Sequence, residues 1–471
     1  MMKQKRDKIF LWIHIATFLV VMLLSARFGE THWAEITLGF VIAYSVPALL
    51  SRILLNGWSQ RFGLLLLGSA LVMSFGITQN LTTYVIENGN FELPGLGWEV
   101  VSDASRDYES ALEYFTTGEV HYVNKGYPMM IGTLFSLAGV NLAFALQLNM
   151  AFALGVIAMS GAIATLMINS NDTKRTAFWG ALLTAAVSSI IFYGTVMLKD
   201  IGVTFGVVCC GYAFARIVKH RIDCYAGVSF ICGGILLALL KSPIGWFIAL
   251  GAIIILATSR CKKERYAGVA AVALSIAISI GGQGLRSNPD SLLLSEKYSE
   301  QTTQDMLDNV PNLERYSSLV SDYYSKSMIE RVALLPLTAA AQYFPPFPWN
   351  FSRDLHLGGF YWYPHIAVGW YLLGGLSLGF LLLLWWRKTD GGMSRWALWI
   401  VLCYLAVAFA SAGSVARYYM PFIPLCVPLA LRFAQSIADG SLSMQSAKIF
   451  SAVYITSLIA ALCLTYWFLK L

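Results

Sequence analysis

The sequence predicts an all-α polytopic membrane protein with about 13 transmembrane helices in a single integral membrane domain, residues 1–471. Hydrophobic residues make up 57% of the chain and charged residues only 13%, whereas a typical soluble domain is about 25% charged. Apolar runs of about 17–25 residues recur from end to end, and each is long enough to cross ~30 Å of hydrocarbon. Such runs form helices because lipid offers no hydrogen-bond partner to an open backbone.

In chain order, the apolar runs predict spans at about 9–25, 34–51, 62–80, 144–168, 177–197, 201–218, 224–240, 243–258, 266–282, 366–386, 396–412, 418–435 and 449–470. Basic residues precede the first span, and positive charge is retained on the cytoplasmic side of a membrane. We therefore expect a cytoplasmic N-terminus and an external C-terminus. The net charge of +7 is spread over short loops between spans, which indicates membrane orientation rather than nucleic-acid binding.

Two longer polar segments interrupt this alternation. The first, 81–127, carries eight acidic and two basic residues, so we expect it to be an extracytoplasmic loop. The second, 283–365, is also expected to be extracytoplasmic, and a juxtamembrane helix is expected in each of the two segments. It ends in a stretch rich in proline and aromatic residues that suits the headgroup region. The loop at 169–176 is expected to be cytoplasmic, so an odd number of crossings must separate it from the first loop. The run 128–142 is therefore expected to be a short interfacial or partly re-entrant helix, and 144–168 the one full span.

An amphipathic helix is expected at 102–118. Polar residues recur there at helical spacing (Asp103, Arg106, Asp107 and Ser110), and apolar residues recur on another side (Tyr108, Ala111, Leu112 and Phe115). Such a helix lies flat on a membrane, with its apolar face down and its carboxylates toward water. One of these carboxylates could accept a proton from an attacking hydroxyl. The simpler alternative is a surface helix whose carboxylates are only solvated.

Five cations are predicted at the outer ends of spans: Lys125, Lys199, Lys241, Arg286 and Arg417. A charge near hydrocarbon is costly, so it indicates a binding role, an ion pair or snorkelling to the interface. For Lys199, pairing with Asp200 is as good an explanation as binding. If several of these cations converge, they would make a seat for a lipid-linked phosphate.

Metal binding is not predicted. His121, His356 and His365 are not arranged at a metal-ligand spacing. This pattern leaves open whether the protein requires a divalent metal for its activity. The cysteines fall in predicted spans or cytoplasmic loops, so no disulfide is expected. Asn80-Leu-Thr fits the N-glycosylation pattern, which is too short to carry weight.

Four patterns in order resemble the GT-C superfamily of polytopic membrane glycosyltransferases, which includes bacterial aminoarabinose transferases and protein O-mannosyltransferases. They are SDASRDYESA in the first loop, NKGYPMMIGTLFSLAGVN after it, MLKDIGVTFGVVCCGYAFAR with LLKSPIGWFIALGAIIILATSR, and ARYYMPFIPLCVPLAL near the end. The resemblance covers roughly residues 100–435. It departs from the family pattern in having two spans before the one that leads into the acidic loop.

The resemblance implies an inverting transferase that moves a sugar from a polyprenyl-phosphate-linked donor to a cell-envelope glycan or glycolipid. Its site would face outward from a bacterial cytoplasmic membrane. Asp103 or Asp107 would be the base, and Lys241 and Arg417 would contact the donor phosphate, with Lys125, Lys199 and Arg286 beside them. Contacts to acceptor or sugar are expected from Glu109, His121, Tyr122 and Tyr418.

Two alternatives fit the same pattern. A polymerase or ligase of surface-polysaccharide repeat units would share the architecture and the phosphate seat. A transporter or flippase of lipid-linked sugars would instead place ionisable groups at mid-membrane and break helices in two related halves. Most ionisable residues here map to the predicted membrane edges, which favours an enzyme.

Overall fold

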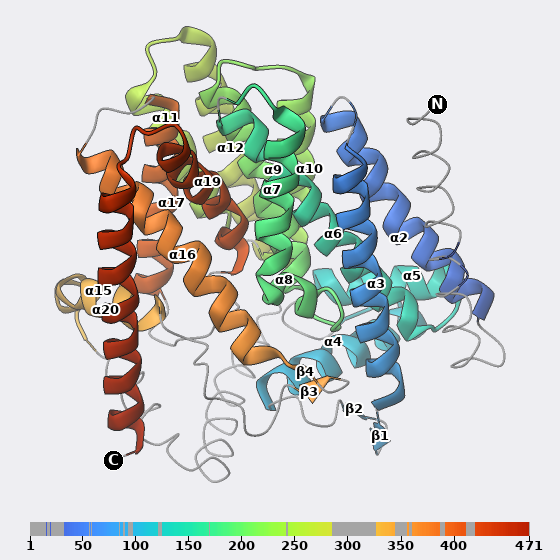
Figure 1. The fold of residues 1–471 in the computed structure, drawn as a ribbon. Helices are drawn as coiled ribbons and strands as arrows, with labels where there is room; N and C mark the ends of the chain where they lie inside the picture. The colour runs from blue at the N-terminus through green and yellow to red at the C-terminus, as the bar shows by residue number, and fades with distance from the viewer. Residues whose placement is uncertain are drawn as a thin grey trace, which may run out of the picture.

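A computed structural model describes residues 16, 19, 33–55, 57, 59–83, 85–87, 90–92, 98–120, 125–168, 170–241, 244–284, 326–343, 356–357, 360–386, 391–410 and 420–470. Helices dominate these ranges (Figure 1): α2 (Trp33–Leu54), α3 (Gln60–Thr83), α4 (Trp98–Thr117), α5 (Gly126–Ala138), α6 (Leu142–Met167), α7 (Thr173–Ala186), α8 (Ser188–Tyr193), α9 (Asp200–Val218), α10 (Cys224–Lys241), α11 (Gly245–Thr258), α12 (Lys262–Gly284), α15 (Met328–Tyr343), α16 (Trp362–Trp386), α17 (Gly391–Ala410), α19 (Ile423–Ala438) and α20 (Met444–Lys470). A short 3-10 helix, η2 (Met420–Phe422), leads into α19. Two small antiparallel hairpins pair β1 (Val85–Glu87) with β2 (Asn90–Glu92) and β3 (His356–Leu357) with β4 (Phe360–Tyr361).

The membrane character is borne out by helix length and composition. Within the described ranges, eight helical segments are long and apolar enough to cross a membrane, in α2, α3, α6, α9, α10, α17, η2 with α19, and α20. Two shorter apolar helices, Gly245–Thr258 and Val368–Leu383, accompany them. The count of 13 spans and their topology stay predictions, and the expected first span at 9–25 lies outside the described residues apart from 16 and 19.

The two ends of the bundle differ in composition. We call one the α4 end, after the helix that lies across it, and the other the basic end, after its cationic residues. The α4 end comprises α4, α5, the start of α9 and the end of α10; there α4 and α5 run across the direction of the long helices (Figure 1). The basic end comprises the ends of α2, α6, α9 and α11 with the starts of α3, α7, α10 and α12. Described cations at the basic end include Arg52, Arg61, Lys174, Arg175, Arg216, Arg221, Lys262, Lys263 and Arg265.

The predicted span at 177–197 is wrong as a single helix. The structure breaks it at Val187 into α7 and the six-residue α8. At this point α16 comes close: a methyl group on Gly369 would lie 2.7 Å from the carbonyl oxygen of Ala186. Thr184 also directs its hydroxyl to the carbonyl of Gly180 at 3.0 Å, a side-chain bond of the kind that bends helices.

The predicted short helix at 128–142 is α5. Its 13 residues extend about 20 Å at 1.5 Å per residue, too little to cross ~30 Å of hydrocarbon. It packs on α4, where a methyl group on Gly132 would meet the carbonyl oxygen of Ala111 at 2.7 Å. The lack of a side chain at this position lets the two helices approach closely.

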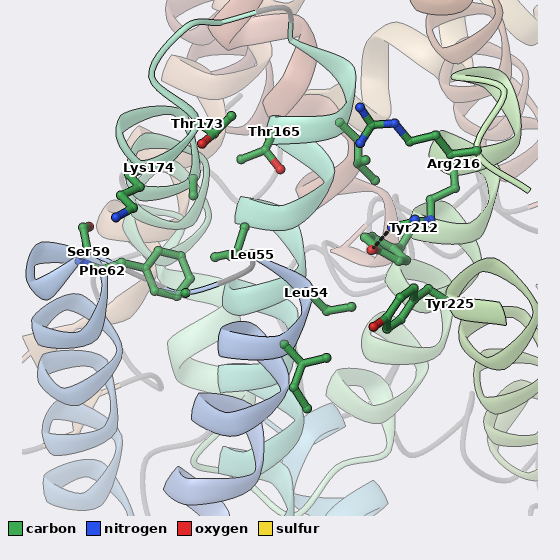
Figure 2. A pocket seen from close by; sticks show the side chains of 15 residues that line it. Leu54, Leu55, Ser59, Phe62, Thr165, Thr173, Lys174, Tyr212, Arg216 and Tyr225 are labelled. Atoms are coloured by element: carbon green, nitrogen blue, oxygen red, sulfur yellow. Dashed lines mark hydrogen bonds between the residues drawn. The ribbon is translucent and has the colours of Figure 1, made fainter. Parts of the chain in front are cut away.

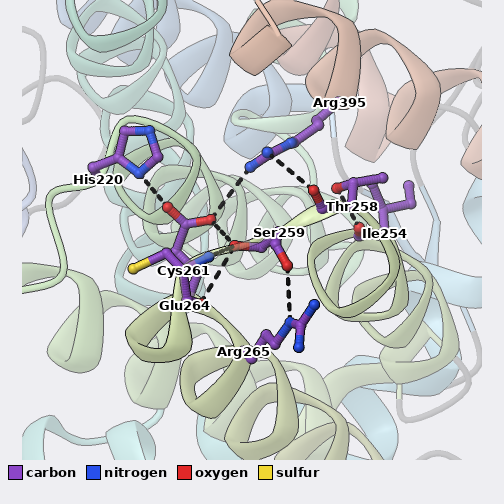
Figure 3. A network of polar contacts seen from close by, with 8 residues as sticks. All are labelled: His220, Ile254, Thr258, Ser259, Cys261, Glu264, Arg265 and Arg395. Carbon is purple, nitrogen blue, oxygen red and sulfur yellow. Dashed lines mark hydrogen bonds and ion pairs between the residues drawn. The ribbon is translucent and has the colours of Figure 1, made fainter.

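Glu264 ties the basic end together (Figure 3). Its carboxylate is 1% exposed, pairs with His220 after α9, accepts the hydroxyl of Ser259 after α11, and lies 3.3 Å from Nη1 of Arg395 on α17. Arg395 also donates to the carbonyl of Thr258 at 3.4 Å. One buried charge thus connects three parts of the chain that are far apart in sequence, and its partners compensate the cost of burying it.

Replacing this carboxylate tests its structural role. Glu264→Ala should lower the free energy of unfolding by about 1–3 kcal/mol, because the partners at the basic end lose their common acceptor. The readout is the thermal unfolding midpoint of the purified protein in detergent. Lys263→Gln, an exposed neighbour on the same helix, is the matched control. Equal midpoints for the two variants would contradict the role.

Candidate functional site

The segment 194–199, between α8 and α9, is not helical, and all of it except Lys199 is buried, so its backbone needs partners other than its own turns. Two asparagines supply them. Asn80 of α3 donates its side-chain amide to the carbonyl of Thr195 at 2.7 Å. Asn149 of α6 donates to the carbonyls of Val196 and Leu198, at 2.6 Å and 2.9 Å. These three bonds fix the segment that delivers Lys199 to the α4 end.

Asn149 also connects the unwound segment to α5. The hydroxyl of Tyr127 donates to Oδ1 of Asn149 at 3.2 Å, and both residues are fully buried. Tyr127 lies in the first turn of α5, two residues after Lys125, which occupies the N-cap position of that helix without a side-chain capping bond. The position of Lys125 is therefore linked through one amide to the position of Lys199.

The end of α10 closes the same group. A methyl group on Gly126 would lie 1.9 Å from the carbonyl oxygen of Leu239, so the start of α5 contacts the α10 backbone directly. A methyl on Gly202 of α9 would lie 2.7 Å from a methyl carbon of Leu240. Lys241 follows these two leucines as the last residue of α10.

Three of the five predicted cations thus belong to neighbouring helix ends. Lys125 adjoins Gly126, which approaches the end of α10, and Lys241 adjoins Leu240, which approaches Gly202 in the first turn of α9. Lys199 adjoins Leu198, which is linked to the start of α5 through Asn149. Each lysine is half-buried. Lysines brought to one end of the bundle in this way are of the residue type that holds phosphate through charge-assisted hydrogen bonds.

Helix α4 exists where the amphipathic pattern predicts it, but the expected orientation of its faces is wrong. Asp107 is only 2% exposed and Ser110 is buried, on the same side as Ala104 and Ala111. The predicted polar face is therefore turned toward protein rather than water. The physical reason is the close approach of α5 at Ala111, which lies one helical turn after Asp107 on the same side of α4, so that α5 packs on this side of the helix.

The predicted apolar face of α4 is used in part by α5 as well. The ring of Tyr108 meets Phe135 edge to face, with 6.2 Å between centroids, whereas Phe115 stays 39% exposed. Glu109 points to the exposed side, as a solvated carboxylate would. Asp103 lies on α4 one helical turn before Asp107.

The remaining predicted site residues lie outside the described ranges. These are Arg286, Arg417, His121, Tyr122 and Tyr418. Within the part of the chain that the structure describes, no group of three or more His, Cys, Asp or Glu residues is placed to hold a metal ion.

Three polar residues of this region had no functional role in the sequence prediction. Asn80 and Asn149 are fully buried in helices, and a polar amide inside a predicted span was the signal that could have found them. Burial also makes Asn80 unsuitable as a glycosylation acceptor. Asp200 is 5% exposed at the first residue of α9, where a carboxylate is favoured by the helix dipole. Among described residues, it makes no ion pair with Lys199.

Comparisons with protein-family models, curated proteins and solved structures found no match for this chain. The chemistry of the α4 end therefore has to be argued from the side chains that meet there.

The asparagine bonds give a direct test of how the site is held. Asn149→Leu leaves two buried carbonyls without a donor, each costing about 1–3 kcal/mol, so the thermal midpoint in detergent should fall markedly. Asn171→Leu changes an exposed asparagine of the α6–α7 loop and should leave the midpoint within a degree or so of the original, because surface changes usually cost under about 0.5 kcal/mol. A similar midpoint for both variants would show that the unwound segment does not need Asn149.

Proposed function

We propose that this protein is a membrane glycosyltransferase that moves a sugar from a polyprenyl-phosphate-linked donor to a cell-envelope glycan or glycolipid. One observation carries the proposal: the helix ends that carry Lys125, Lys199 and Lys241 lie together at the α4 end, where α4 bears Asp103 and Asp107. Positive side chains gathered beside carboxylates are what transfer from a sugar phosphate requires.

The proposed reaction assigns a role to each kind of group. A carboxylate of α4 takes the proton of the acceptor hydroxyl while its oxygen attacks the anomeric carbon. The bond between that carbon and the phosphate oxygen breaks, and the electron pair leaves with the phosphate. The lysines stabilise this growing negative charge. Attack from the face opposite the leaving group inverts the configuration.

Two carboxylates compete for the role of base. The resemblance to GT-C enzymes favours Asp103. Asp107 is favoured by its position on the face of α4 that is turned toward protein, away from bulk water. Arg286 and Arg417 belong to the proposal as further phosphate contacts, on the resemblance and on their predicted place at the outer ends of spans.

A location in a bacterial cytoplasmic membrane, with the α4 end facing outward, belongs to the same proposal. It is supported by the cations at the basic end, which is where the positive-inside pattern expects the cytoplasm. A polymerase or ligase of polysaccharide repeat units would use the same groups and differs only in its acceptor.

A transporter of lipid-linked sugars is the second candidate, and the break between α7 and α8 with the unwound segment 194–199 favours it. Discontinuous helices of this kind line binding sites in transporters. The two candidates differ in outcome: a transporter moves the lipid-linked sugar unchanged across the membrane, whereas a transferase cleaves its sugar–phosphate bond.

Single substitutions on α4 test the transferase. With purified protein in vesicles and a radiolabelled polyprenyl-phosphate sugar, Asp103→Asn or Asp107→Asn should lower transfer by about 10²–10⁴-fold, whichever is the base. Glu119→Gln, on the exposed loop after α4, is the control and should keep activity. If both aspartate variants transfer sugar as fast as the unmodified protein, the assigned mechanism is overturned. If the lipid-linked sugar crosses the vesicle membrane with its sugar–phosphate bond intact, the protein is a transporter.

The lysines are tested by the donor dependence of the same assay. Lys241→Ala and Lys199→Ala should each lower kcat/KM for the donor about ten- to a hundredfold, the effect of losing one charge-assisted hydrogen bond. An unchanged donor dependence in these variants would show that the two lysines do not bind the donor phosphate.

Mass spectrometry of envelope glycans from cells with and without the protein would then identify the sugar and the acceptor together.

A further inference from the structure

A second charged site lies at the basic end, well away from the α4 end. A cavity of about 380 Å³ opens there between the end of α2 and the starts of α3, α7 and α10. Arg216, which lines it, lies 17 residues beyond Lys199, about 25 Å along the α9 axis at 1.5 Å per residue. None of the candidate catalytic residues lines this cavity, so it does not belong to the proposed transferase site.

The wall of the cavity has a cationic part and an apolar part. Lys174, Arg216 and Arg221 supply three positive charges, and no Asp or Glu is among the lining residues. Figure 2 shows Lys174 and Arg216 on opposite sides of the space, with Tyr212 and Tyr225 beside the arginine. Leu54, Leu55 and Phe62 form part of the apolar remainder.

The side chain of Arg216 is held in one position by its neighbours. Its Nη1 donates to the hydroxyl of Tyr212 at 2.6 Å, and its Nη2 pairs with Asp223. Its guanidinium also lies over the rings of Tyr212 and Tyr225, at 5.5 Å and 5.3 Å from their centroids. The side chain is only 12% exposed, and its buried Nε has no hydrogen-bond partner among the described residues.

The other two cations are not neutralised by described carboxylates. Lys174 and Arg221 make no ion pair within the part of the chain that the structure describes. The two nearest acids in sequence are already engaged: Asp172 caps α7 by accepting the backbone N–H of Arg175 at 2.9 Å, and Asp223 pairs with Arg216. The cavity therefore keeps a local excess of positive charge.

We infer that this cavity binds a phosphate-bearing anion, with Arg221 and Lys174 as its ligands and Arg216 as a fixed positive charge in its wall. The fork of an arginine matches phosphate oxygens, and a lysine adds a further charge. The apolar part of the wall and its place at the ends of spanning helices favour the headgroup of an anionic phospholipid over a soluble phosphate. The inference is independent of the proposed transferase activity.

The test is ligand-dependent thermal stability of the full-length protein in a neutral detergent. Phosphatidylglycerol, phosphatidylcholine, oleate and glycerol phosphate are added separately. Phosphatidylglycerol should raise the unfolding midpoint with saturation. The double variant Arg221→Gln with Lys174→Gln should raise its apparent Kd by at least about tenfold, because two contacts to charge are lost. Lys262→Gln with Lys263→Gln, two exposed lysines of α12 outside the cavity, is the matched control and should bind as the unmodified protein does.

Each ligand separates a different outcome. Saturable stabilisation by glycerol phosphate at similar concentrations would assign the site to a soluble phosphate and keep the phosphate inference. Equal stabilisation by oleate would show general attraction of anionic amphiphiles and overturn it. The inference also fails if no ligand discriminates the cavity variant from the control variant. Because Arg221 and Lys174 are exposed, their replacement should leave the ligand-free midpoint unchanged, which separates binding from folding.

Discussion

The hydrogen bonds from Asn80 and Asn149 to the backbone of residues 194–199 are the constraint on which the α4 end depends. An apolar interior offers no water to an open carbonyl, so a break in a spanning helix persists only where side chains replace the missing backbone partners. Here two amides do so for Thr195, Val196 and Leu198. Without them, the chain would have no stable way to turn inside the bundle and present Lys199.

Close backbone approach is the second constraint, and it acts through glycine. Gly126 lets α5 begin against Leu239, and Gly132 lets α5 lie on α4 at Ala111. The first contact brings the start of α5 to the end of α10, and the second turns Asp107 into the protein. The carboxylates and the lysines thus come from separate helices that glycine allows to touch.

Charged side chains serve two different purposes in this bundle. At the basic end, Glu264 is surrounded by compensating groups and serves to connect helices. In the neighbouring cavity, Arg216 is fixed by tyrosines and Asp223 while further cations face the same space. At the α4 end, half-buried lysines gather near carboxylates. Charges that are mutually satisfied stabilise the fold, whereas charges gathered with one sign in excess are suited to a ligand.

The sequence by itself determined the helical membrane character and the positions of most helices, because a long apolar run has no other stable structure in lipid. The span expected at 201–218 is α9, Asp200–Val218, and the amphipathic pattern at 102–118 falls within α4. The tertiary structure alone decided the break at Val187, the burial of Asp107 and the grouping of the lysines. Local periodicity cannot fix these, since they depend on contacts between different helices. The approach of Gly369 to Ala186 and of Gly132 to Ala111 are two such contacts, and the bonds that hold the segment before Lys199 join residues 47 and 115 positions apart.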